Sequence, residues 1–361
     1  METRDRVELL LTPGMTREDW ARLEDAYHRT MAGEDTVTPI TRVLCRYHLK
    51  LFNEDIDRQC AALERTGARL VFRWEPDYPA ALRAIAEAPH ALFVRGELPA
   101  DDRPVIAIVG TRKPSTGGSA LAYELARTLS MLGVLVVSGM ARGIDTAAHH
   151  GALDAGAPTV AVLGTGVDVA YPPENAMLMG RIARDGAVVS EQLCGMHASR
   201  GVFPRRNRII SGMSDAVVVV EGGIRSGALI TARWAADQGR DVGAVPGFPG
   251  GFRSQGPNQL LREGAFVVEH ANDVVSHVKR IAERVRLESL ERAQGDGAGL
   301  DGDAARVYDV VSNATTVDDV ALATGLPVEH AQSLLTLLEI EGRIWRDDAG
   351  NYARSGPRRQ R

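Results

Sequence analysis

Cysteine is scarce in this 361-residue chain, which contains only Cys45, Cys60 and Cys194. Three widely spaced cysteines exclude a disulfide framework, and none of them has the CxxC spacing of a zinc site. We therefore predict three ordinary reduced thiols. The adjacent residues His149 and His150 do not indicate a metal either, because neighbouring helical residues point in different directions. The sequence predicts neither a metal nor a cofactor.

Long apolar runs are also absent. No stretch of about 18 apolar residues is present to cross a membrane, and the charged N-terminus METRDRVELLLTPG has an apolar patch too short for a signal peptide. We expect a cytoplasmic protein without membrane contact. Positive charge is not in excess, since the net charge is −5. Any contact with a polyanion must therefore use a local basic patch.

One segment of the chain provides such a patch. Between Glu191 and Asp215 there is no carboxylate, and there are four arginines: Arg200, Arg205, Arg206 and Arg208. Phe203 lies among them. An exposed aromatic ring beside several arginines is typical of a single-strand nucleic-acid surface, where a base stacks on the ring and cations follow the backbone. We expect one of the three closely spaced arginines to pair with a carboxylate of the domain instead.

The pattern of apolar residues changes along the chain. Residues 1–75 show helical spacing of apolar residues, as in DWARLEDAYHRTM and ITRVLCRYHLKLF, which predicts a small helical domain. Residues 76–283 alternate helix-length segments with six short apolar runs: VIAIVG, VLVVSG, TVAVLG, AVVSE, AVVVVEG and DVGAVPG. This alternation predicts a doubly wound α/β domain with a parallel sheet covered on both faces. Such sheets bind ligands at the carboxyl edge of their strands.

The C-terminal part contains two segments that differ in composition and pattern. Residues 284–303 are rich in charge, glycine and alanine, and predict a flexible linker. Residues 304–361 contain three helical patterns and a hairpin turning at 347–351, an order typical of a winged helix. Residues 314–342 carry five carboxylates and no lysine or arginine. Because phosphates would repel such a recognition helix, we expect this domain to be a protein-docking or regulatory element rather than a DNA reader.

Several loops at the predicted carboxyl edge suit an anion. The first, VGTRKPSTGG, matches neither GxGxxG nor GxxxxGK[ST], but its residues 115–118 could present N–H groups to a phosphate at a helix N-terminus. The loops SGMARGID and EGGIRSG are similar anion-binding turns. Together, these loops could bind successive phosphates of a nucleic-acid strand. The alternative interpretation is that these residues form tight turns that bind no ligand and that Asp145 caps a helix.

Taken together and in order, these motifs resemble one family. The segments VGTRKPS, SGMARGID, AVLGTGVDVAYPPEN, GAVVSE, FPRRNRIISGMSDAVVVVEG, SGALITA and GRDVGAVPG resemble the DNA-processing protein A family (DprA, also called Smf) over roughly residues 76–270. The resemblance implies a SAM-like helical domain, a Rossmann-like domain and a winged-helix-like domain. It also implies a non-enzymatic protein that binds and protects single-stranded DNA, forms a homodimer through the Rossmann-like domain near residues 258–268, and loads the RecA recombinase during natural transformation and recombination.

The resemblance also implies site residues. By motif, the family's single-strand contacts carry over to Gly110, Thr111, Arg112, Ser138, Gly139, Arg142, Gly143, Phe203, Arg205, Arg206, Asn207, Arg208, Ser226 and Gly227. Among these we expect a base to stack on the aromatic ring and four of the arginines, at 112, 142, 205 and 206, to hold phosphates. The N-terminal stretch TPGMT departs from the family's PGxG turn, because Thr16 stands in place of the second glycine. This departure weakens the case for DNA contact by the N-terminal domain.

Two enzymatic alternatives remain. A nucleoside-monophosphate phosphoribohydrolase of the lysine-decarboxylase-like class shares a Rossmann-type sheet and a GG turn, but needs a catalytic glutamate just after that turn. Here no carboxylate occurs between Glu221 and Asp237, so the general acid or base is missing. An NAD-dependent oxidoreductase is disfavoured because GxGxxG is absent and Gly139 stands where an acidic residue would bind the ribose.

Overall fold

The computed structural model describes residues 2–12, 15–32, 53–99, 102–199, 201–284, 302–312, 315–341, 343–347 and 350–354. The predicted helix ITRVLCRYHLKLF, most of the predicted linker, the centre of the TPGMT turn and Arg200 lie outside these residues. The domain boundaries given above stay predictions.

The N-terminal segment is helical, as expected, until its last part. Helices α1 (Thr3–Leu11), α2 (Arg17–Met31) and α4 (Asn53–Thr66) are followed by the strand β1 (Ala68–Phe72). The expectation of helices alone up to residue 75 is therefore wrong. Strand β1 pairs antiparallel with β2 (Ala91–Gly96), so this segment is joined to the main sheet through the backbone.

All six predicted strands are present in one nine-stranded sheet. They are β3 (Val105–Val109), β4 (Leu135–Ser138), β5 (Thr159–Leu163), β6 (Ala187–Ser190), β7 (Ala216–Val219) and β8 (Asp241–Ala244). The sequence missed β1, β2 and the short edge strand β9 (Phe266–Val267). The strand order is β1-β2-β6-β5-β4-β3-β7-β8-β9, and the strands from β6 to β9 are parallel. This is the predicted Rossmann-like doubly wound architecture.

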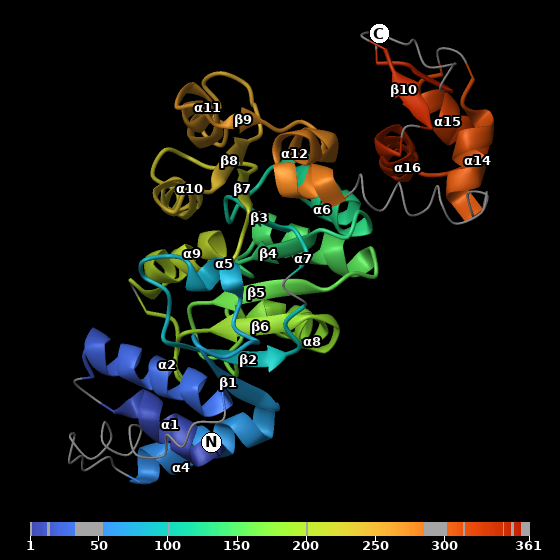
Figure 1. Cartoon of the computed structure of the whole chain (residues 1–361). Coiled ribbons are helices and arrows are strands. Elements are labelled where there is room, and N and C mark those ends of the chain that lie inside the picture. The colour runs from blue at the N-terminus through green and yellow to red at the C-terminus, as the bar shows by residue number, and fades with distance from the viewer. Residues whose placement is uncertain are drawn as a thin grey trace.

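Helices cover both faces of the sheet (Figure 1). On one face lie α6 (Thr116–Met131), α7 (Ile144–Asp154), α8 (Ala176–Asp185) and α12 (Ala271–His277), and on the other lie α5 (Ala80–Arg83), α9 (Val202–Gly212), α10 (Gly227–Asp237) and α11 (Gln255–Arg262). The chain moves outward from β3 in one direction and from β7 in the other. The loops after β3 and β7 therefore meet at the topological switch point, where doubly wound sheets bind ligands.

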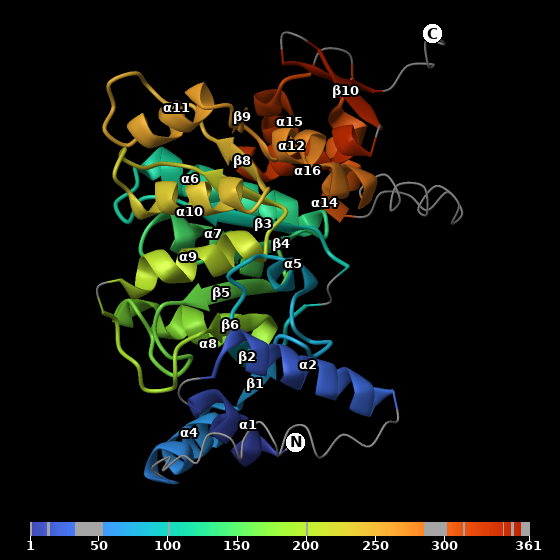
Figure 2. The same ribbon diagram turned by 60° about the vertical axis from the view of Figure 1, so that its left-hand side comes forward.

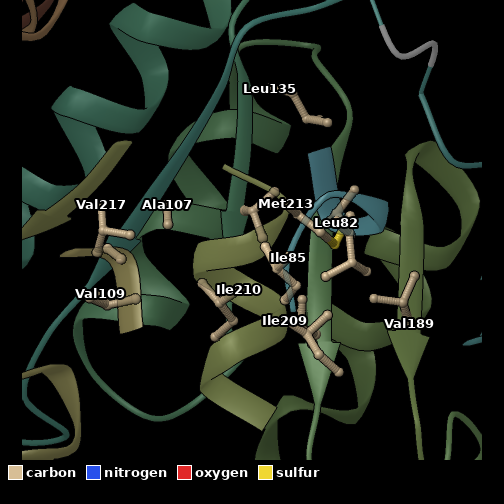
Figure 3. Packing of buried hydrophobic residues seen from close by; sticks show 14 of the residues in the cluster. Leu82, Ile85, Ala107, Val109, Leu135, Val189, Ile209, Ile210, Met213 and Val217 are labelled. Carbon is tan, nitrogen blue, oxygen red and sulfur yellow. The ribbon is translucent and has the colours of Figure 1, made fainter. Parts of the chain in front are cut away.

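The packing of α5 on α9 fixes the position of α9 over the sheet (Figure 3). Leu82 of α5 and Ile85, just after this helix, belong to the same buried cluster as Ile209 and Ile210 of α9. The contact is close at Gly212, where a Cβ atom would lie 2.8 Å from side-chain atoms of both Leu82 and Ile85. Because α9 is held between α5 and the sheet, the directions of the side chains in its first turns are fixed as well.

The C-terminal segment has the predicted order of elements. Helices α14 (Gly302–Val310), α15 (Val317–Thr324) and α16 (Val328–Ile340) precede a hairpin of β10 (Ile344–Arg346) and β11 (Tyr352–Arg354). Its own buried cluster includes residues from all three helices and from the hairpin. The expected winged helix is thus confirmed.

The third helix of this winged helix, α16, packs against the Rossmann-like domain (Figure 2). The Ser333 hydroxyl donates to the Glu124 carboxylate at 2.9 Å and accepts from the Thr128 hydroxyl at 3.2 Å. Arg127 of α6 donates to the Nδ1 atom of His330. In helix-turn-helix proteins the recognition helix enters the major groove, but here that helix is covered by α6.

We predict that Arg127→Glu releases the winged helix from α6. The substitution removes the donor to His330 and puts a second carboxylate beside Glu124, so the interdomain contact loses its only guanidinium among the described bonds. Small-angle X-ray scattering is expected to give a larger radius of gyration for this variant. Arg184→Glu, an exposed site on α8, is the matched control and leaves the radius unchanged. An unchanged radius in Arg127→Glu would show that the domain is held without this guanidinium, by apolar packing and the hydrogen bonds of Ser333.

Candidate nucleic-acid interface

A cavity of about 820 Å³ lies at the topological switch point. The loops after β3 and β7 and the first turns of α9 and α10 line it. The cavity brings together eight of the predicted site residues: Gly110, Thr111, Arg112, Phe203, Arg206, Asn207, Ser226 and Gly227. Among the other lining residues, the sequence reasoning missed the cations and the aromatic ring of Lys113, Phe252 and Arg253. We call this space the switch-point cavity.

One wall of the switch-point cavity combines a cation with aromatic rings. The guanidinium of Arg112 lies 5.3 Å from the centre of the Phe203 ring, and the Tyr171 ring lies 5.2 Å from the same ring. Phe203 sits directly over the backbone of Gly164, where a Cβ atom would come within 3.0 Å of the ring. Arg112 itself is exposed. This wall therefore offers both a stacking surface and a positive charge to a ligand.

The switch-point cavity is lined by a second aromatic ring. Phe252 is 73% exposed, and its ring lies over Gly223, where a Cβ atom would come within 2.8 Å. The next residue, Arg253, donates from Nε to the Lys113 carbonyl at 2.8 Å, which ties this loop to the loop after β3. The stretch GGFRS could have been found from sequence, because it has the same aromatic-plus-arginine composition as the segment around Phe203.

The N-terminus of α6 already holds an anion from the chain itself. This geometry does not favour the expected binding of a phosphate by residues 115–118. The Glu221 carboxylate accepts from the Ser115 N–H at 2.8 Å and from the Ser115 hydroxyl at 2.5 Å. A Cβ atom on Gly118 would lie 2.5 Å from this carboxylate. Glu221, the acid beside the GG turn, is thus engaged as an internal cap. The helix N-terminus is filled by the chain's own negative charge.

The N-terminus of α10 is arranged differently. Its N-cap residue Ser226 and the exposed Gly227 both line the switch-point cavity. The Ser226 hydroxyl is buried and has no hydrogen-bond partner within the described parts of the chain. A helix N-terminus that opens into a cavity favours an anionic ligand, since its first N–H groups lack partners within the helix.

Arg206 lines the cavity, but its guanidinium points into the protein. It donates to the Gly139 carbonyl at 2.8 Å and to the Val162 carbonyl. It also lies near the buried Asp145, which accepts from the backbone N–H groups of Gly139 and Ala141. Burial raises the pKa of Asp145 to about 6, and Arg206 opposes that rise. Arg206 therefore joins the loop after β4 to strand β5. Its predicted phosphate contact stays a prediction that this geometry does not favour.

The other two arginines of α9 share one carboxylate. Arg208, whose side chain is only 4% exposed, lies 2.7 Å from Glu191. Arg205 lies 3.7 Å from the same Glu191, but its side chain is 70% exposed. We expected one of the three arginines to be paired inside the domain. The structure buries two, Arg206 and Arg208, and leaves Arg205 accessible.

The predicted residues of the second loop support the cavity rather than line it. The buried Ser138 hydroxyl donates to the Ile108 carbonyl at 2.6 Å, which joins β4 to β3. Gly143 has a φ of 80° and lies so close to Thr111 that a Cβ atom would come within 2.4 Å of its carbonyl oxygen. Arg142 is exposed and forms an ion pair with Glu174. Asn207, in contrast, lines the cavity and donates to the Gly227 carbonyl at 3.2 Å.

His149, one of the two adjacent histidines considered as metal ligands, is a core residue. His149 is fully buried, its Nδ1 atom lies 2.9 Å from the Thr159 hydroxyl, and burial lowers its pKa to about 3. Within the described residues, no group of three or more His, Cys, Asp and Glu side chains is arranged to hold a metal ion. In the same residues, no helix combines the length and hydrophobicity that a membrane span requires.

Fold and site together define a Rossmann-like protein with a basic, aromatic-lined cavity at the switch point of its sheet. The family model of DNA recombination-mediator protein A matches residues 69–279, and that of the DprA winged helix domain matches residues 291–350. The chain belongs to the DNA recombination-mediator protein A family, DprA.

Relatives support this assignment over most of the chain. Protein Smf of Escherichia coli is 35% identical over 315 residues, which cover 85% of this chain and 83% of that protein. The DNA processing protein DprA of Bacillus subtilis is 33% identical over 272 residues, which cover 74% of this chain and 91% of that protein.

Solved structures agree with the fold. The X-ray structure of DprA from Streptococcus pneumoniae has a TM-score of 0.62 at 33% identity and covers 77% of this chain and 99% of that one. A structure of DprA from Helicobacter pylori, reported for its single-stranded DNA binding mode, has a TM-score of 0.52 at 28% identity and covers 56% of this chain and 93% of that one.

We predict that Arg206→Met destabilises the fold far more than Arg205→Met. Arg206→Met leaves the buried Asp145 without its nearby counter-charge, and an uncompensated buried charge costs about 3–5 kcal/mol, whereas an exposed pair contributes at most about 1 kcal/mol. Chemical denaturation of both variants measures the difference, with the exposed Arg205 as the matched control on the same helix.

The cost of Arg206→Met should also depend on pH. Arg206 lowers the pKa of Asp145, so without it the folded-state pKa rises further above the unfolded value of about 4. A raised folded-state pKa gives stability that is present at low pH and lost as pH rises through that pKa. The variant is therefore expected to lose more stability at pH 8 than at pH 5.5. Equal losses at both values would contradict an ionised Asp145 beside Arg206.

Proposed function

We propose that this chain binds single-stranded DNA in the switch-point cavity and acts as a non-enzymatic mediator of recombination. One observation carries the proposal: the exposed guanidinium of Arg112 lies over the ring of Phe203 in the wall of a cavity that Lys113 and Arg253 also line. Cations beside an aromatic ring suit a strand whose bases stack while its phosphates are neutralised. The single-stranded DNA binding mode reported for the Helicobacter pylori relative supports the same use of the fold.

The geometry suggests how a strand lies. Phosphates approach the N-terminus of α10 and the side chains of Arg112, Lys113 and Arg253, while bases stack on Phe203 and Phe252. Stacking contributes about 1–3 kcal/mol per base and needs an unpaired base. A duplex presents neither free base faces nor a cross-section that fits this space. Binding is therefore expected to be selective for single strands.

Family membership extends the proposal to partners. We propose that the protein protects the bound strand, loads the RecA recombinase onto it during natural transformation and recombination, and forms a homodimer through the sheet edge near residues 258–268. That edge ends in the two-residue strand β9, and its Val267 is half exposed. In the winged helix, Leu322 is 88% exposed beside the acidic start of α15, which suits docking of a protein rather than of DNA.

We predict that Arg112→Ala and Phe203→Leu weaken single-strand binding in different ways. Fluorescence anisotropy of a labelled oligonucleotide in a salt series measures both affinity and the slope of log K against log salt. Arg112→Ala should lower affinity and reduce the slope by about 0.7, the contribution of one phosphate contact. Phe203→Leu should cost about 1–3 kcal/mol with an unchanged slope, because it removes stacking and no charge.

The controls for this experiment are a duplex of the same sequence and the variant Arg184→Ala. Arg184 is exposed and pairs with the adjacent Asp185, away from the switch-point cavity. The Arg184→Ala variant should bind single strands like the wild type. Equal affinity of the wild type for duplex and single strand, or full binding by both cavity variants, would reject the cavity as the DNA site.

A further inference from the structure

A second hollow of about 440 Å³ lies on the other side of the first turns of α9. Four arginines line it, and we call it the arginine groove: Arg17, Arg73, Arg205 and Arg208. Phe203, Pro204 and Arg206 face the switch-point cavity, whereas Arg205 and Arg208 face the groove. Only the width of α9 therefore separates the two spaces. Helices α2 and α9 lie on the same side of the molecule (Figure 1).

Two of the four arginines are engaged inside the protein. Arg208 pairs with Glu191, and Arg73 lies 3.3 Å from Glu24. The other two are available to an outside anion. Arg205 is largely exposed, and Arg17 is exposed and forms no ion pair with any carboxylate in the described part of the chain. Glu24, Glu87 and Glu191 also line the groove. It therefore presents two accessible cations, on α2 and α9, beside carboxylates of which Glu87 is 3.9 Å from Arg208.

The helix that carries Arg17 is held firmly against the rest of the protein. Trp20, one turn further along α2, stacks on His90 with ring centres 4.5 Å apart and an interplanar angle of 9°. Burial and the nearby Arg73 lower the pKa of His90, which favours the neutral ring. The two tryptophans that line the groove, Trp20 and Trp74, are both buried, so we expect the groove to offer cations rather than a stacking ring.

We propose that a DNA strand bound in the switch-point cavity continues over Arg205 into the arginine groove, where Arg17 of the N-terminal helices contacts its phosphate backbone. This inference rests on the proposed function of the cavity. Contact through cations without a stacking ring gives affinity that is independent of sequence. The N-terminal segment thus takes part in binding through a surface of α2 and not through its TPGMT turn.

The test compares two labelled oligothymidylates, one of about 6 and one of about 16 nucleotides, lengths within the range that single-strand sites occupy. Arg17→Glu should leave binding of the short oligonucleotide unchanged, because that strand fills the cavity alone. For the long one it should weaken binding about fivefold or more and reduce the salt slope by about 0.7. Arg22→Glu makes the same charge change on α2 outside the groove, where Arg22 pairs with Glu18, and should bind both lengths like the wild type.

The possible results separate this proposal from the one on which it rests. Arg112→Ala on the short oligonucleotide tests the cavity alone. The groove proposal fails if Arg17→Glu keeps full affinity and slope on the long oligonucleotide, or if it loses binding equally on both lengths. Arg17→Ala should show a smaller loss in the same direction, and equal melting temperatures of the Arg17 and Arg22 variants would confirm that both are folded.

Discussion

The switch-point cavity depends on one buried guanidinium. Arg206 enters from α9 and binds the carbonyl groups of Gly139 and Val162, which lie at the ends of β4 and β5. The approach is so close that a Cβ atom on Gly139 would lie 2.5 Å from the guanidinium. Asp145 supplies the counter-charge and accepts from the backbone of the same loop. One arginine thus joins a loop, a strand and a helix into the floor of the cavity.

Most of the fold could be predicted from sequence, because buried parallel strands read as short apolar runs and their helices separate them regularly. Two of the three missed strands, β1 and β9, lie at the edges of the sheet, whereas β2 pairs with both β1 and β6. Strand β9 has only two residues, too few to show any pattern. Strand β1 follows α4 almost directly, and its sequence ARLVF mixes charge with apolar residues because one end is half exposed. An edge strand is identified by its partner, which local sequence does not reveal.

The site was predictable in outline but not in the direction of its side chains. The rule that ligands bind at the carboxyl edge placed the right loops together. It could not separate Arg205 from Arg206, because successive residues of a helix point about 100° apart and only the packing of α5 on α9 decides which of them faces the interior. Residues 252 and 253 were missed for a similar reason: they follow the last predicted strand, and only the folded loop brings them back to the loop after β3.

Glu221 has a consequence for competition inside a cell. In a dinucleotide-binding sheet, the pyrophosphate rests on the N-terminus of the first crossover helix. Here that place is taken by a carboxylate bonded to Ser115, and a second anion would be repelled by it. The pyrophosphate site that free nucleotides such as ATP and NAD usually occupy is therefore blocked, although these nucleotides share the charge and the aromatic bases of a DNA strand. The protein can keep a nucleotide fold without being saturated by the metabolites for which that fold is usually built.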